Sequence, residues 1–439
     1  MNKINELIAE FCPDGVEYKS IAELFNTKNG YTPSKSHSEY WENGTIPWFR
    51  MEDIRENGRI LSKATQYVSE SAVKGTLFPA NSIIVATSAT IGEHALIKVP
   101  SLANQRFTYL MLKEEYSTCM DIMFVYYYCF KLDEYCKVCL NQGNFASVDM
   151  KKFVKFKFPV PPLEVQREIV RVLDSFTLLT AELTAELTAR KKQYSFYRDK
   201  MLNFGNKAPI YRLSELCESI ADGDHMPPPK SDAGIPFITI SNITEYQRID
   251  FENTMYVPES YYDSLAEKRR PHKGDILYTV VGSYGIPVCI ENDKKFVFQR
   301  HIAILRPDND IVKSRYLFHA MQSTDFKIQA DKSATGAAQK TIALSSLGKM
   351  HISVPDMNVQ ERIVNVLDNF EDICTDLNIG LPAEIEARQK QYEYYRDLLL
   401  TFAETGSTLV TDRQTDRQTD RQTDRQTDRQ TDRQTDRQS

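Results

Sequence analysis

An internal repeat constrains the fold of this 439-residue chain more than any other feature of its sequence. The letters Val-Gln-Arg-Glu-Ile-Val at residues 165–170 recur as Val-Gln-Glu-Arg-Ile-Val at 359–364, a separation of 194 positions. Such self-similarity predicts two copies of one structural unit. Further matches are Val172-Leu173-Asp174 with Val366-Leu367-Asp368, Gln105-Arg106 with Gln299-Arg300, and residues 189–199 with 387–397. The last pair is separated by 198 positions, so four extra residues lie between Phe370 and Ala387.

Each copy consists of a divergent module followed by a well-matched helical segment. Residues 17–158 and 207–352 mix short β-branched and aromatic runs with turn clusters, which predicts α/β modules with a curved, mostly antiparallel sheet. The fold class is therefore α+β, with two such modules in tandem. The predicted segments are a first module at 1–158, a central helix at 159–206, a second module at 207–352, a distal helix at 353–405 and a tail at 406–439.

The central helical segment has a heptad pattern. Residues 163–204 contain neither glycine nor proline, and three prolines precede them. Apolar residues then alternate at spacings of four and three, with polar interruptions at Thr180 and Arg190. Residues 180–187 spell Thr-Ala-Glu-Leu twice. The residues that we expect at a helix interface in this segment are Ile169, Leu173, Phe176, Leu183, Leu187 and Tyr194.

The distal segment repeats this pattern with an interruption. Gly380 and Pro382 interrupt it, and Pro382 suits the first turn of a new helix better than the middle of an old one. A helix this long and amphipathic needs a partner, so we expect the two segments to pair as an antiparallel coiled coil. Two unrelated surface helices are the alternative. The expected interface residues of the distal segment are Ile363, Leu367, Phe370 and Tyr392, with Cys374 and Leu377 continuing the pattern.

Several loops of the modules carry side chains of the kinds that read DNA bases, which are Arg, Lys, Asn, Gln, Ser and Thr. For any single residue, turn chemistry on a solvated surface is the competing interpretation. The candidates in the first module are Asn29, Thr32, Lys35, Arg50, Thr87, Ser88, Thr90, Asn104 and Arg106. Those in the second module are Asp224, His225, Lys230, Thr239, Ser241, Asn242, Ser283, Tyr284 and Arg300.

Charge and motifs limit the function classes. The net charge of −6 argues weakly against nucleic acid, but lysines cluster at residues 151–157 and basic residues at 268–273. A partner would then supply part of the phosphate-binding charge. The sequence has no Asp/Asn/Ser-Pro-Pro-aromatic methyltransferase motif and no glycine-rich nucleotide loop. We therefore predict no catalytic residue and no cofactor in this chain. Cys136 and Cys139 form a lone C-x-x-C pair, and we predict no metal site.

These features together resemble the specificity subunits of type I restriction–modification systems. The resemblance covers residues 5–405 and is strongest at 160–170, at 354–364, at the opening residues 12–18 and at the two Tyr-Arg-Asp helix ends. It implies that each module is a target-recognition domain for half of a split double-stranded DNA site. It also implies that the helices dock two modification subunits, which bind S-adenosylmethionine and methylate adenine, and that restriction subunits join the complex. A coiled-coil scaffold without DNA binding and an orphan DNA-binding regulator are the alternatives.

The last residues and the first residues carry two further expectations. Residues 411–438 are seven copies of Thr-Asp-Arg-Gln, which contain nothing apolar and predict disorder or a transient helix. A slipping ACAG tract in the gene would encode them and would produce phase variation, whereas a functional peptide repeat is the competing interpretation. The first ten residues lack a signal-peptide core, which predicts a cytoplasmic protein.

Overall fold

The computed structural model describes residues 2–141, 146–223, 228–337 and 339–405. The chain divides into two compact units, and the division passes through two long helices. Unit 1 comprises Met1–Leu179 and Arg388–Ser439, and unit 2 comprises Thr180–Ala387. Each unit thus combines one module with parts of the helical segments, so the predicted segment bounds, which separate modules from helices, stay a prediction. Within the described ranges, no helix is both long enough and apolar enough to span a membrane.

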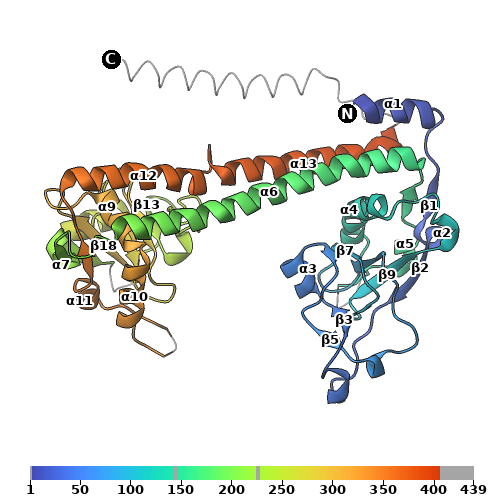
Figure 1. Cartoon of the computed structure of the whole chain (residues 1–439), viewed down its shortest axis with the longest axis horizontal. Coiled ribbons are helices and arrows are strands. Elements are labelled where there is room, and N and C mark those ends of the chain that lie inside the picture. The colour runs from blue at the N-terminus through green and yellow to red at the C-terminus, as the bar shows by residue number, and fades with distance from the viewer. Residues whose placement is uncertain (1, 142–145, 224–227, 338, 406–439) are drawn as a thin grey trace. The chain divides into compact units, whose positions relative to one another are not determined.

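The module of unit 1 is built from a five-stranded sheet (order β2-β9-β6-β7-β4), a three-stranded sheet (β5-β3-β8) and a β1-β10 ribbon (Figure 1). Most strand pairs are antiparallel, as predicted; β3-β8 and β4-β7 are parallel. The strands are β1 (Tyr18–Ser20), β2 (Phe25–Asn29), β3 (Ile46–Phe49), β4 (Ile60–Leu61), β5 (Tyr67–Val68), β6 (Ser82–Ala86), β7 (His94–Ile97), β8 (Leu102–Ala103), β9 (Phe107–Leu112) and β10 (Lys157–Pro159). The helices before the long helix are α1 (Asn2–Phe11), α2 (Ile21–Leu24), α3 (Met51–Asn57), α4 (Ile122–Val138) and α5 (Met150–Phe153).

Alternate residues of the five-stranded sheet face two different cores, as the period of a strand requires. Ile83 and Val85 of β6 pack with α4 and with the long helices, whereas Ile84 and Ala86 pack with β3 and α3. This burial on both faces explains why β6 reads as a continuous apolar run. The first core also contains Ile4 and residues near the end of α13, so α1 packs with the helical layer.

Unit 2 repeats this architecture with a four-stranded sheet (β12-β18-β15-β16), a three-stranded sheet (β14-β13-β17) and a β11-β19 ribbon. The strands are β11 (Ile210–Arg212), β12 (Cys217–Asp222), β13 (Ile235–Ile238), β14 (Met255–Val257), β15 (Ile276–Thr279), β16 (Pro287–Cys289), β17 (Val297–Phe298), β18 (Ile302–Pro307) and β19 (His351–Ser353). The module helices are α7 (Leu213–Leu216), α8 (Glu259–Ser264), α9 (Ser314–Met321), α10 (Thr324–Ser333) and α11 (Leu344–Leu347). Again Ile276 and Tyr278 face the helices, and Leu277 faces the smaller sheet.

The long helices lie within the two predicted helical segments, and the distal one is interrupted near Gly380 and Pro382. Helix α6 (Leu163–Leu202) is continuous over 40 residues. The distal segment forms α12 (Met357–Thr375) and α13 (Leu381–Thr405), with Pro382 in the first turn of α13. A Cβ atom at Gly380 would lie 2.6 Å from the carbonyl oxygens of both Asp372 and Asp376, so only glycine fits there. Leu377 is 49% exposed and does not continue the interface, because α12 has ended before it.

Pairs of aromatic rings join the helices in the order expected of antiparallel partners. In unit 1, Phe176 near the start of α6 stacks on Tyr395 in α13, with ring centroids 5.4 Å apart. In unit 2, Tyr197 near the end of α6 stacks on Phe370 in α12 at 5.6 Å. Phe176 and Phe370 occupy matching positions of the repeat, as do Tyr197 and Tyr395, so the two stacks are copies of one contact.

A buried glutamine near the start of each helical segment fastens the helix to its module. Gln166 accepts a hydrogen bond from the Asp121 amide (2.8 Å) and donates to the carbonyl oxygens of Cys119 and Pro161, both at 2.7 Å. Gln360 does the same with the Lys313 amide (2.9 Å) and the carbonyl oxygens of Ile311 and Pro355. This contact gives a physical reason for the glutamine in the repeated Val-Gln sequence.

Replacing Gln360 by leucine is expected to lower the free energy of unfolding by about 3 kcal/mol or more. The change removes the partner of three partly buried backbone groups, and such a group costs about 1–3 kcal/mol when it is left unsatisfied. Urea unfolding followed by circular dichroism measures the loss. Gln389→Leu on the exposed face of α13 is the control and should leave the midpoint nearly unchanged. Equal midpoints for the two variants would contradict this role.

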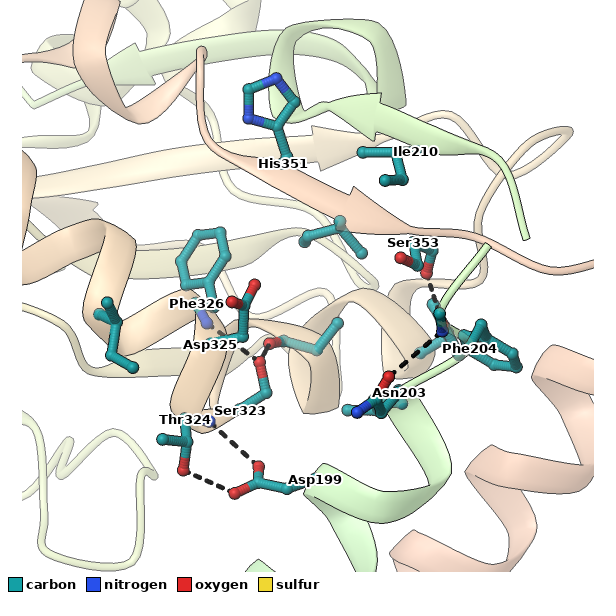
Figure 2. A pocket seen from close by; sticks show the side chains of 16 residues that line it. Asp199, Asn203, Phe204, Ile210, Ser323, Thr324, Asp325, Phe326, His351 and Ser353 are labelled. Carbon is teal, nitrogen blue, oxygen red and sulfur yellow. Dashed lines mark hydrogen bonds between the residues drawn. The ribbon is translucent and has the colours of Figure 1, made fainter. Parts of the chain in front are cut away.

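The Tyr-Arg-Asp end of α6 makes a second connection to the module of unit 2. Asp199 accepts hydrogen bonds from the Thr324 amide (3.0 Å) and hydroxyl (2.5 Å), as Figure 2 shows. It thereby places a negative charge at the first turn of α10, where the helix dipole favours it. Beside it, Arg198 is 5% exposed and donates to Gln322 at 3.2 Å. The pocket drawn in Figure 2 lies next to this connection, between the end of α6, α10 and the β11-β19 ribbon.

The third connection is the aspartate of the repeated Val-Leu-Asp sequence. In unit 1, Asp174 accepts a hydrogen bond from the Tyr127 hydroxyl at 2.5 Å. In unit 2, Asp368 binds the His319 ring at 2.7 Å and accepts from Arg315 at 2.6 Å. Burial lowers the pKa of His319 despite the opposing effect of Asp368. Burial also acts to raise the pKa of Asp368, but the bonds from His319 and Arg315 outweigh it and hold that pKa below its ordinary value.

Unit 2 should therefore lose stability as the pH falls from about 7.5 to 5.5. Unfolded His319 binds a proton below about pH 6.5, whereas the folded, buried ring resists protonation, so acid favours the unfolded state. The urea midpoint at both pH values measures this loss. His319→Tyr, which copies Tyr127, should reduce the difference between the two pH values, and His351→Tyr at an exposed position should not. An unchanged difference in His319→Tyr would rule out this histidine as the cause.

Candidate nucleic-acid interface

In unit 1, the predicted base-reading loops meet at one edge of the two sheets. The loop after β2 joins the turn between β8 and β9 through the Tyr31 amide and the Ala103 carbonyl oxygen (2.8 Å). That turn in turn joins the end of β3 through the Asn104 amide and the Phe49 carbonyl oxygen (3.0 Å). The turn after β6 is attached by the Thr87 amide, which donates to the Arg106 carbonyl oxygen at 3.0 Å. Loops from distant parts of the sequence thus form one surface.

The candidates in this surface differ in exposure. Arg50 is half-buried and lies over the Trp48 ring, 5.7 Å from its centroid, and Thr32 donates a hydrogen bond to Gln105. Thr87 is only 7% exposed, and its hydroxyl pairs with that of Thr108 at 2.9 Å, so its side chain is held inside the module. Exposed candidates are Asn29, Lys35 and Arg106; half-buried ones are Ser88, Thr90 and Asn104.

Unit 2 brings its loops together in the same way. The Gln299 amide donates to the Ile238 carbonyl oxygen at 3.0 Å, and the Val280 amide donates to the His301 carbonyl oxygen at 2.9 Å. Asn242 is 5% exposed and accepts a hydrogen bond from the Thr239 amide at 2.9 Å, so its side chain too is held inside the module. Exposed candidates are Lys230, Ser241, Ser283 and Arg300; half-buried ones are Thr239 and Tyr284, whose hydroxyl donates to Asp331. Asp224 and His225 lie outside the described residues.

The predicted match between Gln105-Arg106 and Gln299-Arg300 is wrong by one residue. Strand β8 pairs with β3 as β17 pairs with β13, which makes Ala103 equivalent to Phe298. Asn104 is therefore equivalent to Gln299, and both donate the same backbone hydrogen bond to the smaller sheet. Identical letters at a separation of 194 positions suggested the wrong alignment, because the strands on both sides of this turn match at a separation of 195 and only the helices match at 194. Arg106 and Arg300 occupy different positions of the turn.

A segment that the sequence does not point to adjoins this edge in both units. The Val148 amide donates to the Thr87 carbonyl oxygen (2.9 Å), and the Ile342 amide donates to the Val280 carbonyl oxygen (2.8 Å). These contacts place the chain just before α5 and α11 beside the turns after β6 and β15. They use backbone atoms only, so residue type carries no signal for them. The two tryptophans at the edge of unit 1 were also missed.

The two basic clusters differ in how far they are neutralised. Lys151, Lys152, Lys155 and Lys157 are exposed in and after α5. In unit 2, Arg269 lies 3.5 Å from Asp222, and Arg270 lies 3.7 Å from Glu267. In unit 1, Lys152 lies 4.0 Å from Asp149, so the charge of the lysine cluster is neutralised at longer distance than that of the two arginines.

Known proteins resemble this chain in both copies of the repeated module. The family model described as the type I restriction modification DNA specificity domain matches residues 13–190 and again residues 207–387. The chain belongs to this family. The specificity subunit is 41% identical over 376 residues to the type I restriction enzyme EcoprrI specificity subunit of Escherichia coli, a match that covers 82% of this chain and 89% of the relative.

Two further relatives agree with this assignment. A putative type I restriction enzyme specificity subunit of Haemophilus influenzae is 33% identical over 272 residues, covering 59% of this chain and 67% of its own length. A solved chain titled as the structural basis of complex assembly and conformational transition of the type I R-M system has a TM-score of 0.57 at 16% identity. It covers 89% of this chain and 97% of its own length, which shows that the two share a fold. The specificity subunit is the non-catalytic DNA-recognition component of such an enzyme.

Two groups of potential metal ligands in the specificity subunit are occupied by other interactions. In the described residues, His319, Asp368 and Glu371 are the group whose ligand atoms lie within 4.8 Å of one another. The Arg315 guanidinium donates to both of these carboxylates and neutralises them. Burial raises the pKa of the Cys136 thiol to about 12, with a further contribution from Asp133. Cys136 lies in α4, and Cys139 is the residue that caps the end of this helix.

Proposed function

We propose that the specificity subunit reads a split site in double-stranded DNA, with one module for each half-site. The observation that carries this proposal is the recurrence of one loop surface in both units, on equivalent strands and with different side chains. A shared scaffold with variable polar loops suits two readers of different sequences, since base edges are discriminated by hydrogen bonds from such side chains.

Exposure selects which candidates are proposed to touch bases or phosphates. Thr87 and Asn242 are left out because they are buried and hydrogen-bonded within their modules. The exposed lysines that follow α5 would contact phosphates rather than bases. The proposed contact residues are Asn29, Thr32, Lys35, Arg50, Ser88, Thr90, Asn104 and Arg106 in unit 1, and Lys230, Thr239, Ser241, Ser283, Tyr284 and Arg300 in unit 2.

The long helices are proposed to form one antiparallel coiled coil that separates the modules and docks two modification subunits. The matched ring stacks support the pairing. Docking is supported by Phe196, which is 61% exposed, and by Tyr394 at the matching position of the repeat, which is 52% exposed. Large exposed aromatic side chains are typical of interface hot spots, and two equivalent ones suit two copies of the same partner. Restriction subunits would join through the modification subunits, which would bring S-adenosylmethionine.

Exchange of one module tests the proposal. Residues 207–352 are replaced by the corresponding module of a relative, the complex is assembled, and methylated adenines are mapped by sequencing. One half of the recognised sequence should change and the other half should stay the same. The matched control replaces residues 17–158 and should change the opposite half. A change in both halves, or in neither, would contradict independent reading by the modules.

A further inference from the structure

Both tryptophans of the chain hold one loop of unit 1, residues 30–42 between β2 and β3. The indole of Trp48, which is 5% exposed, donates to the Tyr31 carbonyl oxygen at 2.9 Å. The indole of Trp41 donates to the Ser34 carbonyl oxygen at 3.1 Å. The two rings meet edge to face with centroids 5.0 Å apart. A surface loop with two indole hydrogen bonds to its own backbone is unusually well fixed.

The start of this loop lies against the candidate DNA-reading edge. A Cβ atom at Gly30 would come within 2.4 Å of the carbonyl oxygens of Ala103 and Asn104, so the backbone passes directly over the β8–β9 turn. The Tyr31 hydroxyl accepts from the Lys74 amide at 2.7 Å and donates to the Ala72 carbonyl oxygen. These contacts fix the direction in which the loop leaves the sheet.

The returning part of the loop is held as firmly as the start. Ser69 donates its amide to the Tyr40 carbonyl oxygen (3.0 Å) and its hydroxyl to the Glu39 carbonyl oxygen (2.8 Å). Between the two anchored parts, Lys35, Ser36, His37 and Ser38 are exposed. The His37 ring stacks on Tyr40 at 4.9 Å, which orients it without burying it. The tip therefore presents polar side chains from a backbone of fixed shape.

We propose that residues 35–38 are a preorganised base-reading tip of the first module, and that Trp41 is the positioning residue that keeps the tip in its reading conformation. This inference rests on the proposed function. Lys35 and His37 can donate hydrogen bonds to the guanine and adenine acceptors of the major groove, and Ser36 can donate or accept. Fixing the loop beforehand reduces the entropy lost on binding, which favours discrimination by a short segment.

The test uses the full specificity subunit assembled with its modification subunits, and methylated adenines mapped at base resolution. Lys35→Ala combined with His37→Ala should weaken the preference for the correct base about tenfold in one half-site and leave the other half-site unchanged. Trp41→Leu should relax the same half-site, and Trp41→Phe, which keeps a ring but loses the donor, should have a smaller effect. Lys63→Ala, at an exposed position outside the loop, is the control.

A second readout reports the loop directly. Because the chain has two tryptophans, a 5-fluorotryptophan-labelled subunit gives two fluorine resonances in the complex, assigned with Trp41→Phe. Cognate duplex should shift the Trp41 resonance, and duplex altered in the affected half-site should not. Unchanged base preferences in the double variant, with wild-type thermal unfolding, would overturn the proposal. A wild-type complex that methylates without any sequence preference would instead refute the proposed function.

Discussion

Replacing Leu173 by aspartate is expected to unfold the helical layer of unit 1 and to prevent assembly with the modification subunits. Leu173 is fully buried, in a core that also contains Ile4 of α1, Phe124 of α4 and Leu399 of α13. Loss of such a leucine costs about 2–5 kcal/mol, and an unpaired carboxylate in its place adds a desolvation penalty. The free energy of unfolding of a domain is about 5–15 kcal/mol, so this one change removes a large part of it.

Other leucines of the same helix provide a graded series for this test. Leu183 is half-buried and should show an intermediate loss as Leu183→Asp, whereas Leu178→Asp, at a side chain that is 61% exposed, is the control for folding. Leu367, the repeat equivalent of Leu173, is also fully buried and should respond as strongly in unit 2. Thermal unfolding by circular dichroism and co-purification with the modification subunit measure both effects. An intact complex from Leu173→Asp would contradict the assigned interface.

Inserting a third Thr-Ala-Glu-Leu after residue 187 is expected to lengthen the unspecified gap between the half-sites by one base pair. Four helical residues add about 6 Å and about 40° of rotation. One base pair advances B-DNA by about 3.4 Å and rotates it by about 34°. The rotations nearly match, and bending or tilt must absorb the difference in length. In the present repeat only Thr180, Leu183 and Leu187 are partly buried, so an added copy disturbs little packing.

Mapping of methylated sites for the two-copy and three-copy proteins measures the gap. Both half-site sequences should be unchanged, because the recognition loops lie elsewhere. An insertion of four alanines at the same place is the matched control: it adds the same length without the leucine and should give the same gap at lower stability. An unchanged gap in the three-copy protein would mean that the repeat does not set the spacing.

The helical framework could be predicted because its signals are local. The heptad pattern of α6 and the break at Gly380 and Pro382 follow from side-chain periodicity and backbone geometry, which the letters record directly. Leu377 continues the heptad spacing in the sequence but does not lie at the helix interface, because α12 ends at Thr375. The structure describes contacts between the paired helices of the predicted coiled coil. The predicted disorder of the tail at 411–438 lies outside the described residues.

The surface of loops was only partly predictable, because it depends on pairings between distant strands. Polar residue types selected loops that the structure brings together at one edge, yet they could not separate exposed Arg106 from buried Thr87. The turn after β8 was aligned one residue out of register with the turn after β17. The alignment rested on two identical residues, and the strand pairing that gives the correct register cannot be seen in the sequence. Trp41 and Trp48 were overlooked because each acts through a hydrogen bond to a backbone carbonyl, which no motif records.

The buried glutamines have a consequence for how such proteins can diversify. Gln166 and Gln360 hold their modules through main-chain amides and carbonyl oxygens, which every non-proline residue supplies. At the glutamine, an exchanged module therefore needs the right backbone path and no particular side chain, whereas the contacts of Asp174 and Asp368 do need a side chain of the module. Selection can then change nearly the whole recognition surface without compensating changes in the helix that carries it. Because the glutamine binds backbone atoms only, it can hold modules of different sequence, and one genetic exchange can then supply a new target sequence.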